Sequence, residues 1–468
     1  MVRPLAEKSD KIGPIGKDRD GWVTGPSLGP LGLDYPKTRK RNVKMPDQSQ
    51  WPACCTVENP CPHHVGHDAI AATVDLDRTL TLDGVRRGSA EAELDRRGLD
   101  RRLLLRGAAL GGLFVAGAPG LAKAAAPKGG AIEPAPLGRV HKVESSSETV
   151  RVGIMDPKAP AAAMIESGDV VHYPNTWVNW ADEAKYGMSF EEREPIRKKY
   201  TAGPYSLVGP IEIKGAEPGD VIECRMLRLR PIDWGWNSTP KGVGAIPEDF
   251  DAPYLHYLRF DADRRTADFG NGVKIPLAPI QGVMAAQPAG DEPVSGILSG
   301  VYGGNLVLRE LVEGTSVFLP VQVAGGRMWT GDSHAAQGDG VVDQTGIETA
   351  MEDLRIQYIL HKRMKLDAPL ADTPTHWITL GFGDSLDDAL KASLRQMIAW
   401  LSPTSGLSRN DIYALASLAG SFRVTQYSHQ INTNYRNVPP KAVHGMLAKE
   451  IFDPALRRQI DQALRPGA

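Results

Sequence analysis

A succession of short strand-like runs, each closed by turn residues, is the feature that most limits the fold of this chain. Three runs between residue 144 and the C-terminal third alternate apolar and polar residues: 149–154, 221–229 and 317–323. Alternation with a period of two is typical of strands that bury one face. In the second run we expect Ile222, Cys224 and Met226 to face away from Glu223. In the third run, Pro320 predicts a break or a sheet edge.

The same pattern precedes two of the expected strands. Residues 165–171 and 216–222 each place a Gly-Asp pair directly before a β-branched run. The chain of 468 residues also holds 49 Gly and 36 Pro, which favours many turns. Repeated entries of this kind are typical of a sandwich or barrel of related strands.

Helical periodicity is confined to the C-terminal third. Ser385 precedes apolar residues at helical spacing up to Leu401, and Asp388 follows at the position of a capping box. Ser408 opens a second short helix that we expect to end at Gly420. The sequence therefore predicts an α+β fold, predominantly β, with a β-sandwich or barrel-like core and a few helices in the C-terminal third.

The first part of the chain differs from the rest. Residues 1–50 are rich in Gly, Pro and charge and lack a sustained apolar period. We interpret residues 1–100 as a low-order prefix that a downstream translation start would leave out of the protein; the alternative is that the prefix is a genuine part of it. Residues 101–126 run from twin arginines through an apolar middle to small residues, which is the order of an export signal of the twin-arginine type. A buried Ala/Leu helix with basic flanks is the alternative. The apolar middle is too short for a stable membrane span, which needs ~20 apolar residues. We therefore expect residues 140–468 to form a periplasmic globular domain.

Composition and cysteine content exclude several classes. The formal net charge of -2 provides no general attraction for nucleic acid or an anionic membrane. Cys224 stands alone after the prefix, so no intramolecular disulfide is expected there. The prefix holds a dense thiol and imidazole cluster whose spacing fits no zinc module, and we interpret it as accidental: Cys54, Cys55, Cys61, His63, His64 and His67.

The densest polar and glycine-rich segment spans residues 329–340. Asp332 and His334 lie two residues apart, so in an extended strand they point the same way and can bind one metal ion or form an acid-base pair. A hairpin turn with solvated Asp and His is the bland alternative. A second glycine-rich segment, 300–305, is able to offer backbone amides to a small polar substrate. After the first 100 residues, the sequence contains no nucleophile elbow, phosphate-binding loop or dinucleotide fingerprint.

Five segments, in this order, resemble the acetamidase/formamidase family: 209–220, 303–305, 331–340, 373–382 and 422–426. The resemblance covers roughly residues 140–455. It implies a β-rich, homo-oligomeric hydrolase that cleaves the C–N bond of short linear amides, such as formamide and acetamide, to ammonia and a carboxylate.

The resemblance also implies a site. Zinc or another divalent metal would polarise the amide carbonyl, with Asp332 and His334 as metal ligands and catalytic residues. His376 would be a third ligand or a proton shuttle. The implied substrate-binding residues are Gly303, Gly304, Asn305 and Gln337.

Two valines depart from the family pattern. Val307 stands where the family commonly has Asp, and Val341 where it commonly has Glu. These replacements would remove a potential ligand and a potential general base. Two further function classes therefore stay open. One is a catalytically impaired homologue that binds a small amide-like ligand or serves as an assembly subunit; the other is an amidase in which Asp339 or Asp343 takes over.

Overall fold

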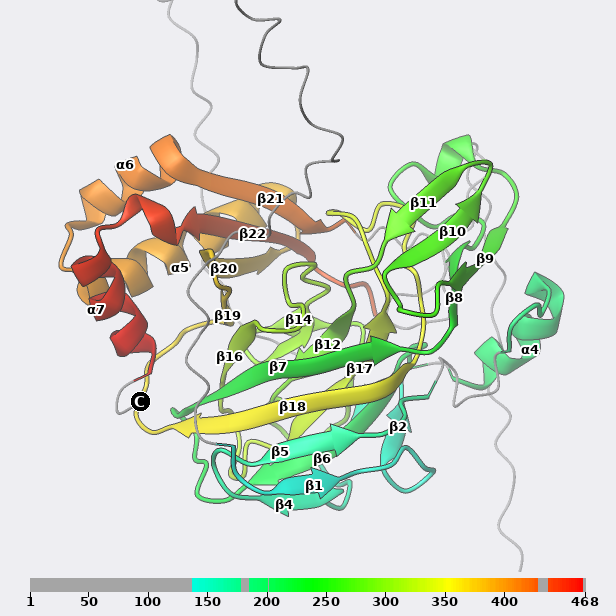
Figure 1. Cartoon of the computed structure of the whole chain (residues 1–468), viewed down its shortest axis with the longest axis horizontal. Helices are drawn as coiled ribbons and strands as arrows, with labels where there is room; N and C mark the ends of the chain where they lie inside the picture. The colour runs from blue at the N-terminus through cyan, green and yellow to red at the C-terminus, as the bar shows by residue number, and fades with distance from the viewer. Residues whose placement is uncertain (1–136, 178–184, 201, 428–436, 466–468) are drawn as a thin grey trace, which may run out of the picture. The chain divides into compact units, whose positions relative to one another are not determined.

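Two β-sheets packed face to face form the centre of the structure (Figure 1). This computed structural model describes residues 137–177, 185–200, 202–427 and 437–465, all within the unit Leu121–Ala468. The expected prefix, export signal and Cys/His cluster lie outside the described residues. The prediction of a predominantly β fold with helices towards the C-terminus is confirmed.

The larger sheet has nine strands in the described part of the chain. In spatial order they are β1 (Val140–Lys142), β5 (Val170–Tyr173), β18 (Met351–His361), β7 (Val221–Pro231), β16 (Ser316–Pro320), β19 (Leu370–Asp372), β20 (His376–Gly383), β22 (Lys441–Ala448) and β21 (Gly420–Gln426). Only β1 and β5 pair in parallel in this sheet, and every other neighbouring pair is antiparallel.

A seven-stranded sheet packs against it. Its strands are β14 (Ser299–Gly300), β15 (Gly303–Asn305), β12 (Ile280–Ala285), β17 (Met328–His334), β6 (Ser206–Ile213) and β2 (Val150–Val152), with β4 (Ala163–Ile165) paired to β6. A short pair joins β3 (Ile154–Met155) to β13 (Val294–Ser295).

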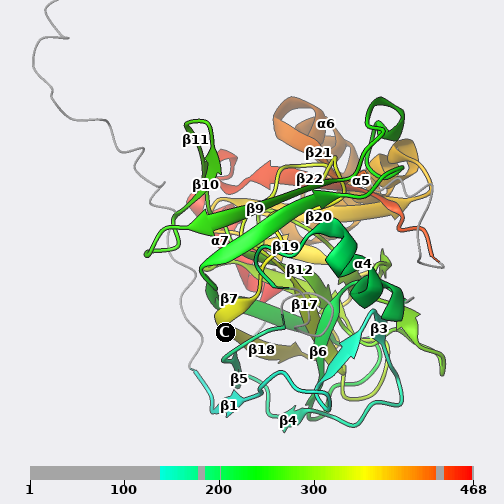
Figure 2. The same cartoon turned by 90° about the vertical axis from the view of Figure 1, so that its right-hand side faces the viewer.

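A smaller four-stranded sheet extends from one side of this sandwich, and Figure 2 shows its outer hairpin projecting. Its strands are β8 (Trp234–Thr239), β9 (Tyr254–Phe260), β10 (Thr266–Gly270) and β11 (Val273–Pro276). The helices are α4 (Phe190–Lys199), α5 (Leu386–Ser405), α6 (Arg409–Ala419) and α7 (Pro454–Leu464), with 3₁₀ turns at Pro247–Asp249 and Lys449–Ile451. None of the helices in the described ranges is long and apolar enough to cross a membrane.

Strand β7 shows how sequence alternation builds the core. Ile222, Cys224 and Met226 are fully buried between the two large sheets, as predicted. Val221 belongs instead to the apolar cluster under α5, α6 and α7, which cover the outer face of the nine-stranded sheet. The alternation therefore places side chains of one strand in two apolar cores. Glu223 points towards the core between the nine-stranded sheet and the helices.

The repeated Gly-Asp entry forms the same turn twice. Gly168 and Gly219 both have φ of 93°, a left-handed conformation that suits glycine. The Asp169 carboxylate accepts a hydrogen bond from the backbone amide three residues earlier (3.0 Å), and Asp220 does the same (2.9 Å). The turns lead into β5 and β7, so both Gly-Asp pairs deliver the chain into a strand, as predicted.

The remaining local predictions hold with small shifts. The run 149–154 divides into β2 and β3 at Gly153, which has φ of 81°. Strand β16 ends at Pro320. Ser385 caps α5 by accepting from the Asp388 amide, and Ser408 forms a full capping box at the start of α6.

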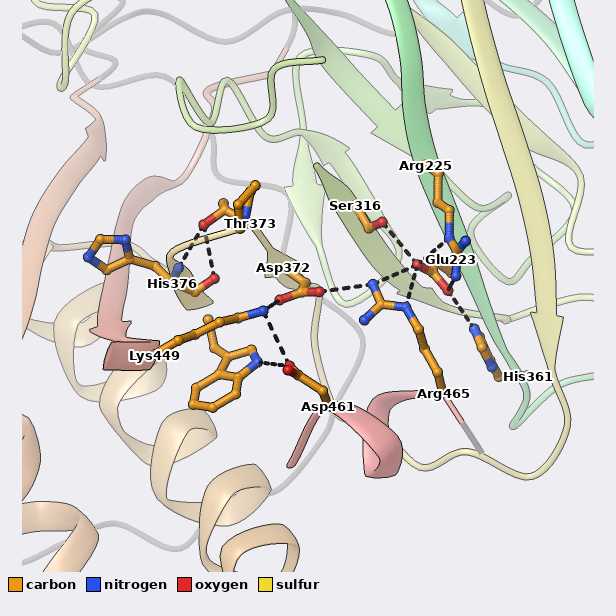
Figure 3. Close-up of polar contacts among 12 residues, drawn as sticks. Glu223, Arg225, Ser316, His361, Asp372, Thr373, His376, Lys449, Asp461 and Arg465 are labelled. Atoms are coloured by element: carbon orange, nitrogen blue, oxygen red, sulfur yellow. Dashed lines mark hydrogen bonds and ion pairs between the residues drawn. The ribbon is translucent and has the colours of Figure 1, made fainter. Parts of the chain in front are cut away.

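A buried ionic network ties the outer face of the nine-stranded sheet to the end of α7 (Figure 3). The Glu223 carboxylate accepts hydrogen bonds from Arg225 (2.8 Å), His361 (2.9 Å) and Arg465 (2.8 Å). Arg465 also contacts Asp372 at 2.9 Å. Burial opposes ionisation of Glu223, but His361, Arg465 and Arg225 together hold its pKa well below the usual range. The network fixes Arg465, the residue that follows α7, to the sheet.

Replacing this carboxylate is expected to destabilise the fold. Glu223→Gln leaves the buried Arg225 without its counter-charge and Arg465 with Asp372 alone, so we predict a loss of about 3–5 kcal/mol at pH 7 in urea unfolding. The pKa of Glu223 is lower in the folded state, so its ionic stabilisation is complete above the unfolded value of about 4.3 and is lost as the pH falls towards the folded pKa. The gap between wild type and variant should narrow below about pH 4. A pH-independent gap, or an equal loss in the exposed control Glu217→Gln, would contradict this account.

Candidate active site

Asp332 and His334 lie at the end of β17, a strand that is buried along its whole length. The strand pairs with β12 on both sides of Gly282, which places Gly282 opposite Asp332. Asp332 has φ of 55°, a left-handed conformation that Asp tolerates better than most residues. A Cβ on Gly282 would stand only 2.4 Å from Asp332 Oδ2. The missing side chain at Gly282 therefore makes room for the carboxylate.

A third residue, Glu348, completes the group. His334 Nε2 lies 3.4 Å from Asp332 Oδ2 and 3.1 Å from Glu348 Oε1. The two side-chain carboxylates and the imidazole are each less than one-tenth exposed. We call Asp332, His334 and Glu348 the Asp-His-Glu cluster. The sequence predicted that the first two point the same way, and the structure brings them together.

Glu348 was missed because no local spacing links it to the glycine-rich segment. It reaches His334 through an isolated antiparallel bridge between the two residues, and a second bridge joins it to Trp236 in β8. The backbone around it also pairs with β17, since Thr349 N donates to Ser333 O at 2.9 Å. Such a long-range pairing leaves no periodic signal in the sequence.

Gln337 determines the orientation of the His334 ring. Its amide nitrogen donates to the Val307 carbonyl, so its Oε1 faces His334 Nδ1 at 2.7 Å. Because this oxygen can only accept, we assign the proton of the neutral ring to Nδ1. The Nε2 lone pair then faces the two carboxylates. Gln337 therefore acts as a positioning residue for His334.

The cluster has the electrostatics of a cation site. Burial disfavours a charged His334, yet Glu348 and Asp332 raise its pKa well above the usual value. Burial raises the pKa of Asp332 to about 6, with Glu348 adding to the effect and His334 opposing it. Neither Asp332 Oδ2 nor His334 Nε2 forms a hydrogen bond within the described residues. A bound proton or a metal ion would relieve this concentration of acceptors.

The donor set fits a divalent metal. One ligand atom from each residue of the cluster lies within 4.8 Å of the other two. An imidazole nitrogen with two carboxylate oxygens is a set that zinc accepts, and three protein ligands leave a position for substrate or water. Gln337 supplies the outer hydrogen bond that typically orients a ligating histidine.

His376 lies elsewhere. It begins β20 in the nine-stranded sheet, opposite Ala448, and its Nδ1 contacts Thr375 Oγ1 at 2.8 Å. Burial and the positive charge of Arg423 lower its pKa. It does not join the Asp-His-Glu cluster, and Glu348 is the third residue beside Asp332 and His334.

The segment Gly303-Gly304-Asn305 forms β15, next to β12. Gly303 and Gly304 have φ of 90° and 96°, and a Cβ on either would lie 2.3 Å from a backbone oxygen. Their glycine identity is thus explained by close strand packing. Asn305 is buried, and its Oδ1 has no hydrogen-bond partner among the described residues.

The two valines that depart from the family pattern, Val307 and Val341, differ in their position relative to the cluster. Val307 is held against the site, since its amide donates to the Gly282 carbonyl at 2.9 Å and its own carbonyl accepts from Gln337. Val341 lies in a turn closed by the Gln344 amide. Both have left-handed backbones, with φ of 40° and 45°, which is unusual for a β-branched residue.

Neither of the alternative carboxylates enters the cluster. Asp339 groups with Glu310 and His444, where Arg309 and Arg423 lie 3.6 and 3.7 Å from its carboxylate and balance the charge. Asp343 lines a large cavity beside Gln337. Burial raises the pKa of Asp343.

Comparison with known proteins shows the family to which this chain belongs. The sequence profile described as "Acetamidase/Formamidase family" matches residues 145–295 and 292–453, which is more than half of the chain. The chain belongs to the acetamidase/formamidase family. The matched residues include the whole Asp-His-Glu cluster.

Relatives within the family are distant in sequence. The chain is 24% identical over 253 residues to the formamidase of Methylophilus methylotrophus and 22% identical over 250 residues to the acetamidase of Mycolicibacterium smegmatis, in each case over 41% of this chain. It spans 59% and 61% of the lengths of these two relatives, respectively. The crystal structure of an acetamidase from Bacillus halodurans is 26% identical and superposes with a TM-score of 0.59, covering 67% of this chain and 99% of that one.

The contact between Gly282 and Asp332 can be tested directly. Gly282→Ala should push the Asp332 carboxylate out of place and lower the free energy of unfolding by about 1–3 kcal/mol, the usual range for overpacking. Urea unfolding followed by fluorescence measures this change. Gly338→Ala is the matched control, because a Cβ there meets nothing within 4 Å. Equal stability of the two variants would show that Gly282 is not required.

Proposed function

We propose that this chain hydrolyses the C–N bond of short linear amides, such as formamide and acetamide, to ammonia and a carboxylate. The Asp-His-Glu cluster is the observation that carries the proposal, because it is a buried, pre-organised group of one imidazole and two carboxylates within the residues that the family profile matches. The names of the relatives support the same activity.

We further propose that the cluster holds zinc or another divalent metal. Asp332, His334 and Glu348 would be the ligands, since their facing atoms include two without hydrogen-bond partners. Such an ion supplies a Lewis acid that polarises the amide carbonyl.

The protein groups prepare the site for this chemistry. Gln337 holds the Nδ1 proton of His334 and keeps the ring in one orientation. Gly282 leaves space for the carboxylate of Asp332 on the buried side of the strand. Burial excludes water around the cluster, so charges there act on a substrate more strongly than in solvent. His376, on the other large sheet, has no assigned role in this proposal.

A catalytically impaired homologue that binds a small amide-like ligand remains the second candidate. The observation in its favour is Val307, an apolar residue in direct backbone contact with both Gly282 and Gln337. A carboxylate at that position would lie beside the cluster. In our proposal, Glu348 provides the carboxylate that Val307 lacks.

We also propose that the chain is exported to the periplasm by a twin-arginine-type signal in residues 101–126 and that it works as a homo-oligomer. The order of basic, apolar and small residues in that segment supports the first point. Export of a folded protein would allow the metal to be inserted beforehand.

The activity is tested by ammonia release. Purified protein supplied with zinc should hydrolyse formamide or acetamide, and Glu348→Gln should lower kcat/KM by at least about 100-fold, the scale on which removal of a catalytic electrostatic group acts. Glu292→Gln, an exposed carboxylate change, is the control and should keep full activity. Absence of turnover by the zinc-loaded wild type on both amides would rule out the proposed substrates.

The role of Val307 is tested by restoring a carboxylate. If Glu348 provides the carboxylate that the site needs, Val307→Asp should change the rate of ammonia release by less than about twofold, because the cluster already carries two carboxylates. Val307→Asn is the uncharged control for the same shape, and both side chains tolerate the left-handed backbone better than valine. A tenfold or larger gain in Val307→Asp over Val307→Asn would favour the impaired homologue.

A further inference from the structure

Ser333 separates Asp332 from His334 in the sequence, and its hydroxyl group has no part in the proposed hydrolysis. Its Oγ lies 3.0 Å from Nε2 and 3.2 Å from Oε1 of the Gln281 amide on β12. It also lies 3.3 Å from Oγ1 of Thr176, which belongs to the segment that follows β5. Ser333, Gln281 and Thr176 are all buried. These contacts therefore join β17 of the seven-stranded sheet to the chain that leaves the nine-stranded sheet at β5.

Thr176 also holds the start of β18. Its Oγ1 accepts a hydrogen bond from the Met351 amide at 2.7 Å, and its own amide donates to the Met351 carbonyl at 2.9 Å. The hydroxyl proton of Thr176 then has Ser333 Oγ as its acceptor, and the hydroxyl proton of Ser333 has Gln281 Oε1. Each hydroxyl proton in the row has an acceptor. We call Gln281, Ser333 and Thr176 the Gln-Ser-Thr link.

The link spans the point at which the chain that carries Glu348 changes sheets. Thr349 N donates to Ser333 O at 2.9 Å, so the chain is still paired with β17 one residue after Glu348. Two residues later, Met351 begins β18 in the nine-stranded sheet. The separation of 3.1 Å between His334 Nε2 and Glu348 Oε1 therefore depends on how the chain is held at this crossing.

We propose that the Gln-Ser-Thr link positions Glu348 against His334 and that Thr176 is a positioning residue of the site. The inference rests on the proposed metal-dependent amidase function and adds a residue to it. Thr176 acts through Ser333 and Met351, and not on the reacting atoms. A functional site must be held within about 0.5 Å of its productive geometry. Loss of an outer hydrogen bond around metal ligands costs roughly 10- to 100-fold in metal affinity.

The affinity of the purified protein for zinc tests the inference. Thr176→Val keeps the shape of the side chain and removes the hydroxyl, so the zinc Kd, measured by competition with a chromophoric chelator, should rise at least about tenfold. Thr176→Ser keeps the hydroxyl and should leave the zinc Kd within about twofold of the wild-type value.

Thr379→Val is the matched control. Thr379 is also buried, its Oγ1 donates to Ser393 O at 3.0 Å, and it lies on β20. Both valine variants leave a buried polar group without its partner and should lower the urea midpoint of unfolding. Only Thr176→Val should weaken zinc binding.

Two results would overturn the inference. One is a zinc Kd in Thr176→Val within about twofold of wild type, far below the usual effect of such a loss. The other is an equal rise of the zinc Kd in Thr379→Val, which would trace the effect to a general loss of stability. Ser333→Ala breaks the link at its middle and gives the same test if Thr176→Val does not fold.

Failure of the proposed function is distinguishable from failure of this inference. If zinc binds but no amide is hydrolysed, the hydrolase proposal fails and the zinc Kd values decide the role of Thr176. If amides are hydrolysed without zinc, kcat/KM for acetamide decides it by the same pattern among the variants. If the wild type does neither, crystal structures of wild type and Thr176→Val decide it through the distance between His334 Nε2 and Glu348 Oε1. An increase of about 0.5 Å or more supports the inference, and an unchanged distance overturns it.

Discussion

The approach of two buried carboxylates to one ring nitrogen of His334 is the interaction on which the rest of the site depends. Burying charge without solvent is costly, so a fold retains such a group only when its surroundings fix it in place. Here Gly282 on the neighbouring strand leaves room for the Asp332 carboxylate, and Gln337 holds Nδ1 of the His334 ring. The same arrangement leaves acceptor atoms directed at one point, which explains why a divalent cation fits there.

Stability and chemistry are separated in this sandwich. The Asp-His-Glu cluster belongs to the seven-stranded sheet and its connection to β8, whereas the Glu223 network lies on the outer face of the nine-stranded sheet. In that network the positive charges satisfy the buried carboxylate, so it contributes to stability. In the cluster the acceptors outnumber the donors, which suits ligand binding and costs stability.

The sequence predicted those parts of the structure that follow from local periodicity. The faces of β7, the caps of α5 and α6 and the meeting of Asp332 with His334 all follow from spacing within one element. Helix α7 was missed although Asp453 and Pro454 form a recognisable start. Glu348 was missed for a different reason, because pairing between distant strands brings it to His334. The glycines of β15 were read as ligand contacts, but close strand packing already explains them.

Zinc binding tests the central claim most directly. X-ray absorption spectroscopy on zinc-loaded wild type should show one equivalent of zinc with nitrogen and oxygen ligands only, including one imidazole. His334→Ala should abolish this site, while His256→Ala on the four-stranded sheet should retain it. Sulfur coordination, or the same zinc content and spectrum in His334→Ala, would contradict the assignment of the Asp-His-Glu cluster as the metal site.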